Sequence, residues 1–558
     1  MSVTACRGTQ LRCRSWRAEA LLRLLENVLE VGERPEELVV YASIGKAVKD
    51  WDAYRQITDA LRRLGEDQTL VLQTGRPVAV LNTHAAAPMV VSAVNNTVGN
   101  WATEERFYSR LAEHKTIWGG LTAAAWQYIG RQGVLGGTYE LLRAALDRHF
   151  QETTAPHRWV LTAGLGGMGS SQPISARMLG LSTLVVEADP TKLSRLHAAG
   201  GLDLVLDDLS EALAAVATAT AKRRAVAVGL LGNAAEIFPA IAASEALPDI
   251  VTDQTAAHDA RYGYLPAGYT LETWTSARER DPGRVERDAR ASMAAQIQAM
   301  LELGDRGSVV FENGNNLRVQ ASQVLGEGER ERVFAEIPGF MEAYLRPLFS
   351  RGIGPFRWMI LSGDEHDLKV VDDLASTMFP ERPEIARWIG LARRHIPSQG
   401  LPARSCWLGY GERSALAVAV NEAVADGRIT APVAFSRDHL DSAGMTHPRI
   451  GTEGMRDDSD GVTDWPLLDA MLLAAGGADL VAVHSGGGGY SGWMQSAGVT
   501  IVADGTQAAA IRLRRALDLD SGLGVIRHAT AGYGEALDAV EKSRQPGAHG
   551  EPLNLIQN

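Results

Sequence analysis

The sequence predicts an α/β protein whose central region is a doubly wound parallel sheet. From Trp159 to about Glu336, short apolar segments typical of buried strands alternate with helical segments. The loops after these segments are rich in small and polar residues, as expected where ligands bind outside the carboxyl ends of parallel strands. The expected strands are Trp159–Thr162, Thr183–Val186, Ala225–Leu230, Asp249–Thr252 and Ser308–Phe311.

Length and composition limit the class of protein. With 558 residues the chain is longer than one ordinary domain, and 45% hydrophobic with 22% charged residues is typical of a soluble globular protein. The net charge of −12 argues against nonspecific binding to nucleic acid or to an anionic membrane. No apolar run of about 20 residues predicts a membrane span. An odd set of 3 cysteines without metal-ligand spacing predicts no disulfide framework and no metal site, and favours the cytoplasm.

A glycine motif follows the first expected strand of this region. Gly164, Gly166 and Gly169 have the G-x-G-x-x-G spacing, and a helix is expected to start at Ser170. These glycines allow a tight turn, approach of a pyrophosphate to the backbone, and close packing of helix on strand. Glu187 ends the next strand, about 20 residues on, where a ribose partner is expected. An ordinary Gly-rich turn is the alternative, but strand, glycines, helix, strand and acid together favour a Rossmann-like dinucleotide site.

Outside the central region the pattern is less regular. Helical periodicity covers Ala18–Leu29 and Thr138–Phe150, and a short strand is expected at Glu37–Tyr41. A strand–turn–strand is expected over Thr69–Leu81, and a further strand at Val433–Phe435. Clustered glycine and proline between Pro347 and Trp358 predict a compact loop.

Six stretches, in this order along the chain, together resemble urocanase (urocanate hydratase). They are Leu161–Gly169, Val251–His258, Gly263–Gly268, Gly354–Trp358, Gly400–Gly411 and Arg437–Ser442. The similarity runs from Arg7 to about Thr506. It implies a Rossmann-like NAD-binding domain at 131–338, inserted in a second α/β core domain. That core would be built from an N-terminal segment, 1–130, and a C-terminal catalytic segment, 339–558.

The resemblance also implies a reaction that the glycine spacing alone does not. In this family NAD⁺ acts as an electrophile toward the imidazole ring of the substrate, and it is not a hydride carrier. The net reaction adds water to an imidazole-acrylate, so the chain is expected to be a hydro-lyase. The family also implies a homodimer.

Cofactor positions are carried over from the family's motifs. Gly167, Met168 and Gly169 match the pyrophosphate turn, and Glu187 matches the ribose-binding acid. The other positions expected to contact NAD⁺ are Ala42, Ser43, Lys192, Asn233, Ala234, Gln254, Thr255, His258, Tyr264, Leu265, Asn313 and Gly488.

Substrate positions are carried over in the same way. Arg357 matches the arginine that pairs with the substrate carboxylate, a task suited to a planar guanidinium. A surface salt bridge is the alternative, although Phe356 and Trp358 beside it favour burial. Tyr41 and Thr122 match polar groups near the substrate, and His84 is a further candidate.

Three residues are candidates for the chemistry itself. Cys406 matches the cysteine that the family marks as its active-site residue, although composition alone favours a buried structural thiol. Asp438 and His439 are better candidates for proton transfer, because water addition needs a base and an acid. The alternative is a loop-capping aspartate next to a histidine satisfied in the core.

The departures from the family concern the loops expected to face the substrate. Glycine replaces a usual glutamine at Gly120, and serine replaces a usual histidine at Ser485 and Ser496. These changes leave space, while soft side chains that favour contact with sulfur are added. The added side chains are Trp118, Met445, Trp493 and Met494.

These departures predict S-methyl thiourocanate, from S-methyl ergothioneine breakdown, as substrate. Plain urocanate, from histidine breakdown, and thiourocanate remain alternatives. Two other classes of protein are also alternatives: an NAD-dependent dehydrogenase and a non-catalytic NAD-binding module.

Overall fold

The computed structural model describes residues 3–41, 44–130, 132–151, 154–441, 443–448, 451–487 and 490–556. The chain forms two compact units. We call the first the mixed-sheet unit, made of Met1–Gly136, Arg346–Pro448 and Gly454–Asn558. We call the second the parallel-sheet unit, made of Gly137–Leu345 and Arg449–Glu453. No helix in the described ranges is both long and apolar enough to cross a membrane.

The parallel-sheet unit confirms the predicted doubly wound sheet. All its strands are parallel, in the order β11-β10-β6-β7-β9-β8. The first strand, β6, lies between β7 and β10, so the winding direction reverses there. The strands are β6 (Trp159–Ala163), β7 (Ser182–Glu187), β8 (Leu204–Leu206), β9 (Ala227–Leu231), β10 (Ile250–Val251) and β11 (Val309–Val310). The sequence analysis missed β8, a three-residue edge strand with little burial.

Helices alternate with these strands along the chain. The first, α4, crosses the sequence boundary at which the parallel-sheet unit begins. The helices are α4 (Gln132–Phe150), α5 (Gln172–Met178), α6 (Pro190–Ala198), α7 (Leu209–Ala221), α8 (Ala234–Ala242), α9 (Leu271–Arg280), α10 (Pro282–Asp305), α11 (Leu317–Ser322) and α12 (Glu327–Glu336).

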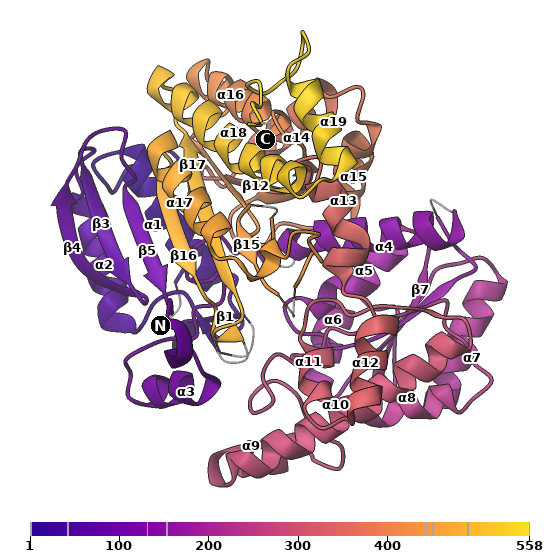
Figure 1. The fold of residues 1–558 in the computed structure, drawn as a ribbon. Helices are drawn as coiled ribbons and strands as arrows, with labels where there is room; N and C mark the ends of the chain where they lie inside the picture. Colours follow the sequence, from indigo (N-terminus) through magenta and orange to yellow (C-terminus); the bar gives the residue numbers. More distant parts are fainter. Residues whose placement is uncertain are drawn as a thin grey trace. The chain divides into compact units, whose positions relative to one another are not determined.

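The mixed-sheet unit joins the two ends of the chain in one sheet. Its order is β13-β12-β14-β17-β16-β5-β3-β4, with β15 paired to β17. The seam is the parallel pair β5–β16, from Val90 opposite Leu480 to Val94 opposite His484. Figure 1 shows indigo β3, β4 and β5 beside orange β16 and β17. The predicted second α/β domain, built from the N- and C-terminal segments, is confirmed.

The strands of this sheet come from both ends of the sequence. They are β3 (Gln68–Gln73), β4 (Arg76–Asn82), β5 (Val90–Val94), β12 (Gly354–Ile360), β13 (Ala403–Leu408), β14 (Val433–Arg437), β15 (Met445–Thr446), β16 (Leu480–His484) and β17 (Gln495–Ala503). A separate antiparallel pair is formed by β1 (Val39–Tyr41) and β2 (Gly45–Lys46). The helices are α1 (Trp16–Glu30), α2 (Trp51–Arg63), α3 (Glu104–Ala112), α13 (Arg346–Phe349), α14 (Glu365–Met378), α15 (Pro383–His395), α16 (Glu412–Ala425), α17 (Asp464–Gly476), α18 (Gln507–Thr530) and α19 (Gly534–Ser543).

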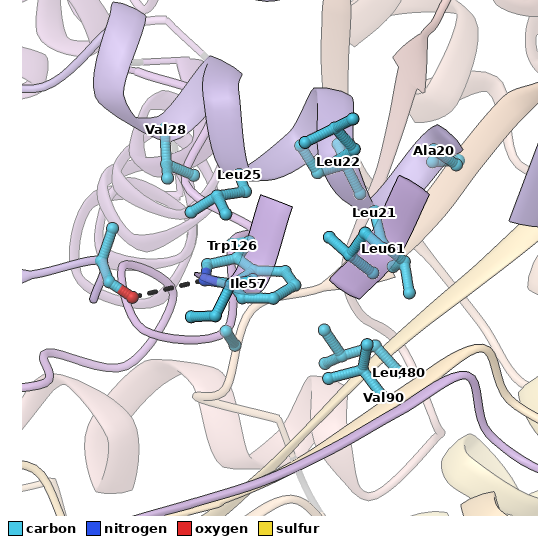
Figure 2. Close-up of a cluster of buried hydrophobic side chains, with 14 of the residues drawn as sticks. Ala20, Leu21, Leu22, Leu25, Val28, Ile57, Leu61, Val90, Trp126 and Leu480 are labelled. Atoms are coloured by element: carbon cyan, nitrogen blue, oxygen red, sulfur yellow. Dashed lines mark hydrogen bonds between the residues drawn. The ribbon is translucent and has the colours of Figure 1, made fainter. Parts of the chain in front are cut away.

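One apolar core covers the seam of the mixed sheet. Leu21 and Leu25 of α1 and Ile57 of α2 belong to the same buried cluster as Val90 and Leu480 from the two seam strands. Figure 2 shows this cluster around Trp126, whose indole Nε1 donates to the Ala47 carbonyl at 3.3 Å. Burial of this shared surface ties the two ends of the chain together.

The compact loop predicted between Pro347 and Trp358 is wrong at both ends, because Pro347–Phe349 lie in α13 and the loop is confined to the residues between α13 and β12. Residues Gly354–Ile360 form β12, buried along its whole length between β13 and β14. Glycine and proline are local signs of a loop, but pairing on both sides and burial decide the structure here. Pro355 stands at the strand's start, where its carbonyl accepts from the Asp438 amide at 3.1 Å.

Candidate functional sites

The glycine turn follows β6 at the point where the winding reverses. Gly164 has φ +88°, and a Cβ there would stand 2.4 Å from the Gln254 carbonyl oxygen. A Cβ on Gly169 would stand 2.0 Å from the Gly164 oxygen, so both positions need glycine. At Gly166, by contrast, a Cβ would meet no atom within 4 Å beyond its chain neighbours. The turn therefore has a packed underside and an open flank at which a ligand can approach the backbone.

The predicted ribose acid is tied to this turn. Glu187 ends β7 and is buried, and its Oε2 accepts from the Leu165 amide at 2.6 Å. Its Oε1 accepts from the Asp189 amide at 2.9 Å, with the Lys192 ammonium 3.9 Å away. The carboxylate is thus fixed beside the glycine turn, where a sugar hydroxyl next to a bound pyrophosphate would lie.

Two further pairs of loops close over the same edge of the sheet. Asn233 caps α8 by accepting from the Ala235 amide at 2.9 Å, and its Nδ2 donates to the Leu265 carbonyl at 3.1 Å. Gln254, after β10, donates from Nε2 to the Asn313 carbonyl at 2.6 Å. These cross-links bring predicted cofactor residues from separate loops into one group.

The sequence analysis missed a buried support beneath these loops. Asp253 accepts from Thr255 Oγ1 at 2.6 Å and from Gln296 Nε2 at 2.9 Å, and it also pairs with the Asn315 amide. Burial raises the pKa of Asp253 to about 6. Tyr264 joins through its hydroxyl, which donates to Gln296 Oε1 at 2.8 Å. The sequence did contain one signal for this support, because Asp253 is an acid that directly precedes Gln254 of the family motif after β10.

The other predicted cofactor residues lie at the same edge or outside the described ranges. Gly167 and Met168 complete the turn, Ala234 starts α8, and His258 is buried after β10. Ala42, Ser43 and Gly488 fall outside the described residues. The open flank at Gly166, the fixed acid and the linked strand-end loops fit a dinucleotide.

In the mixed-sheet unit, Arg357 of β12 is the centre of a buried polar group. It is 1% exposed, which excludes the surface salt bridge considered as an alternative. Its Nη1 donates to the Gln127 carbonyl at 3.0 Å, and its Nη2 to the Gly133 carbonyl at 3.3 Å. It also pairs with Asp438, while its Nε has no hydrogen-bond partner in the described ranges.

Tyr41 and Thr122, the two polar residues that the resemblance predicts near a substrate, contact one another. The Tyr41 hydroxyl accepts from the Leu121 amide at 3.0 Å and lies 3.2 Å from Thr122 Oγ1. Burial raises the pKa of Tyr41, and the nearby Asp438 charge raises it further. Gly120 adjoins Tyr41, since a Cβ there would stand 3.4 Å from the hydroxyl oxygen.

His439 is fully buried and bonded through both ring nitrogens. Its Nε2 lies 2.8 Å from Gln127 Oε1, and its Nδ1 lies 3.3 Å from Ser496 Oγ. Burial lowers the pKa of His439, and neighbouring His484 and two arginines lower it further, so the ring is neutral. The hydrogen-bond partners of the ring are thus Gln127 and Ser496, and of these two the Ser496 hydroxyl is the one that can both donate and accept a hydrogen.

His484 lies beside His439, with ring centroids 5.2 Å apart. Burial lowers its pKa to about 4, and the nearby Gly120 backbone partly offsets this shift. Neither ring nitrogen has a hydrogen-bond partner in the described ranges. In the β16–β17 pairing His484 stands opposite Ser496, so their side chains share one face of the sheet. Gly120 and Ser496, two of the positions that depart from the family, thus border the same histidine. Ser485 instead bonds to the Asn95 carbonyl.

The structure separates Cys406 and His84 from this group. Cys406 of β13 pairs with Phe356, whereas Arg357 pairs with Ser405. Because neighbouring residues of a strand point to opposite faces, the buried thiol lies on the face opposite Arg357. This argues against a catalytic thiol. His84 is exposed before β5 begins, whereas the polar group adjoins His484, opposite the last residue of β5.

A buried ionic cluster lies on the Cys406 face, behind the polar group. Arg437 pairs with Asp469 at 2.6 Å and Asp520 at 2.7 Å, and Arg413 pairs with Asp441 at 2.6 Å. Burial raises the pKa of Asp469, and the Asp520 charge raises it further. Arg437 Nη1 also donates to the Asp438 carbonyl at 3.1 Å, which fixes the backbone that carries Asp438 and His439.

These features define an α/β enzyme with a dinucleotide-type turn and a buried arginine–aspartate–histidine group. Three family models match consecutive parts of the chain: the urocanase N-terminal domain (3–127), Rossmann-like domain (130–344) and C-terminal domain (347–542). S-methyl thiourocanate hydratase from Variovorax sp. (strain JCM 16519 / RA8) is 47% identical over 532 residues, 95% of each chain. The chain belongs to the urocanase family and is a hydratase of the hydro-lyase class.

Proposed function

We propose that this urocanase-family hydratase adds water to S-methyl thiourocanate, with NAD⁺ as cofactor. The proposed substrate rests on Gly120 and Ser496, which both lie near buried His484. Ser496 stands opposite His484 in the β16–β17 pairing, and the Gly120 backbone lies close enough to affect the pKa of His484. Both replace larger side chains usual in the family, so they leave room for a substituent on the substrate ring. The hydratase from Variovorax, named for this substrate, supports the same choice.

Arg357 is the anchor for the acrylate carboxylate. A carboxylate prefers the planar edge of a guanidinium, and the Nε of Arg357 is buried without a partner in the described ranges. Asp438 shares this arginine and is about one-fifth exposed, so a water or substrate atom can reach it. We assign proton transfer at the substrate to Asp438. His439, enclosed by Gln127 and Ser496, would act through the Ser496 hydroxyl.

In the parallel-sheet unit, the residues that would hold NAD⁺ are the glycine turn, Glu187 and the loops bearing Asn233 and Gln254. When bound, the cofactor would supply an electrophilic nicotinamide ring. The protein's part would be to hold the pyrophosphate on backbone amides and the ribose on Glu187.

The test is an ultraviolet assay of the purified holoenzyme with urocanate, thiourocanate and S-methyl thiourocanate, supplied separately. Loss of the conjugated chromophore should be fastest with the S-methyl compound, without net NADH formation at 340 nm. Faster turnover of urocanate or thiourocanate would identify that compound as the substrate in place of S-methyl thiourocanate. NADH formation would indicate a dehydrogenase, and NAD⁺ binding without turnover a binding module.

We further propose that the enzyme is a homodimer, as its family implies. Light scattering of the purified protein should give a mass near twice the 59.9 kDa of one chain. A mass equal to one chain would overturn this assembly without affecting the proposed reaction.

A further inference from the structure

Gln127 links the arginine and the histidine of the polar group. It is fully buried, and no motif in the sequence marks it. Its carbonyl accepts from Arg357 Nη1 at 3.0 Å, and its side-chain oxygen lies 2.8 Å from His439 Nε2. One residue therefore contacts two groups from separate segments, Arg357 of β12 and His439, which follows β14.

The orientation of the Gln127 amide follows from its other contacts. Its Nε2 lies 2.8 Å from the Val499 carbonyl oxygen and 3.0 Å from Thr500 Oγ1. A carbonyl only accepts, so the NH₂ group must face it, and the amide oxygen must face His439. That oxygen also only accepts, so His439 Nε2 must carry the hydrogen.

We propose that Gln127 is a positioning residue that holds His439 as the neutral Nε2–H tautomer, which leaves Nδ1 to accept the Ser496 hydroxyl. In a neutral imidazole one nitrogen donates and the other accepts, so fixing Nε2 as donor fixes Nδ1 as acceptor. Ser496 Oγ, 3.3 Å from Nδ1, then donates its hydrogen to the ring. The hydroxyl's lone pairs stay available on the face shared with His484.

The surroundings of His439 suit a neutral partner such as Gln127. His484, Arg437 and Arg357 each oppose a positive charge on the ring, and burial opposes it most. Asp438, next in sequence, is paired with Arg357. A carboxylate in place of the Gln127 amide would reverse this balance by stabilising the imidazolium and so placing a second hydrogen on Nδ1.

The first test is nitrogen-15 NMR of histidine-labelled holoenzyme, with the signal assigned by its loss in His439→Gln. The ring should carry its hydrogen on Nε2 at neutral pH. In Gln127→Glu both nitrogens should be protonated. A hydrogen on Nδ1 in the wild-type ring, or a neutral ring in Gln127→Glu at neutral pH, would overturn the proposal.

The second test is the pH profile of kcat. In Gln127→Glu, kcat should fall as pH falls through the raised pKa of His439 and recover at alkaline pH, while the wild-type profile stays flat there. Gln127→Met should lower kcat about 10-fold at every pH. Gln73→Glu, which adds the same charge next to Arg76, should behave as wild type.

A folded Gln127→Glu holoenzyme with the wild-type pH profile would also overturn this role. The kinetic test rests on the proposed hydratase function, but the NMR test needs no turnover. Absence of turnover with every imidazole-acrylate would therefore defeat the proposed function while NMR still decided the tautomer.

Discussion

The two candidate sites are built in different ways. In the parallel-sheet unit, the predicted cofactor residues follow successive strand ends, and the turn between Gly164 and Gly169 is one short segment. In the mixed-sheet unit, the polar group gathers Tyr41, Gln127, Arg357 and Ser496, which are far apart in sequence. The first site depends mainly on backbone geometry, and the second on buried side chains that satisfy one another.

This difference sets how each site should respond to change. A backbone site tolerates substitution wherever no Cβ enters the turn, and it fails where one does. A buried polar group fails when any charged member loses its partner, because an unpaired charge in a low-dielectric interior is costly.

The largest effect is expected at Arg357. Arg357→Lys should lower kcat/KM about 1000-fold, because lysine cannot reproduce the guanidinium contacts to Gln127, Gly133 and Asp438. The matched control is Arg404→Lys, which breaks a buried pair with Asp372 on the opposite face. The control should lose stability in denaturant but keep kcat/KM within about 3-fold. Similar kcat/KM values for both variants would show that Arg357 is not part of the substrate site.

A smaller effect is expected at the open flank of the glycine turn. Gly166→Ala should leave thermal stability unchanged, because its Cβ meets no packed atom, yet weaken NAD⁺ binding about 30-fold by blocking the pyrophosphate. Gly328→Ala, also at an open position, is the control and should bind NAD⁺ normally. Calorimetric titration of cofactor-stripped protein measures both. Normal NAD⁺ affinity in Gly166→Ala would place the pyrophosphate elsewhere.

Selectivity should change by about 10-fold at Ser496. Ser496→His refills the space beside His484 and should shift the kcat/KM ratio from S-methyl thiourocanate toward urocanate, since bulk in a pocket discriminates at this level. Ser485→His is the control, because Ser485 is bonded to the Asn95 carbonyl and not to the polar group. An unchanged kcat/KM ratio in Ser496→His, or an equal shift in the control, would show that Ser496 does not contact the substituent of the substrate ring.

The smallest effect concerns the pH dependence of stability, for which the two units have opposite signs. Burial lowers the pKa of His447, in the mixed-sheet unit, to about 3. Below about pH 6.5, the unfolded chain therefore binds a proton at this histidine while the folded chain does not. Each such group removes about 1.4 kcal/mol of stability per pH unit as pH falls. Asp253, in the parallel-sheet unit, has a pKa raised to about 6. The folded chain therefore binds a proton there before the unfolded chain does, which raises the free energy of unfolding as pH falls from about 6 to 4.

His447→Gln isolates the histidine contribution. The free energy of unfolding of wild type relative to this variant should fall by about 2 kcal/mol from pH 7.5 to pH 5, measured by denaturant titration at each pH. A pH-independent difference for His447→Gln would show that this histidine titrates normally.

The parallel sheet and the glycine turn could be predicted from the sequence. Strand, turn, helix and acid are neighbours along the chain there, so local periodicity and glycine spacing carry the information. Even so, it missed Asp253 and Gln296, which meet only because a helix packs under a strand-end loop.

The second site depends instead on contacts between distant parts of the chain. Resemblance named Arg357, Asp438 and His439, but strand register placed Cys406 on the opposite face, and the packing of separate segments brought Gln127 and Ser496 to His439. Gln127 lies in a stretch with no motif, and β12 had the composition of a loop. Long-range pairing and burial, which no local pattern encodes, set these positions, because side chains from distant strands satisfy one another only after the sheet forms.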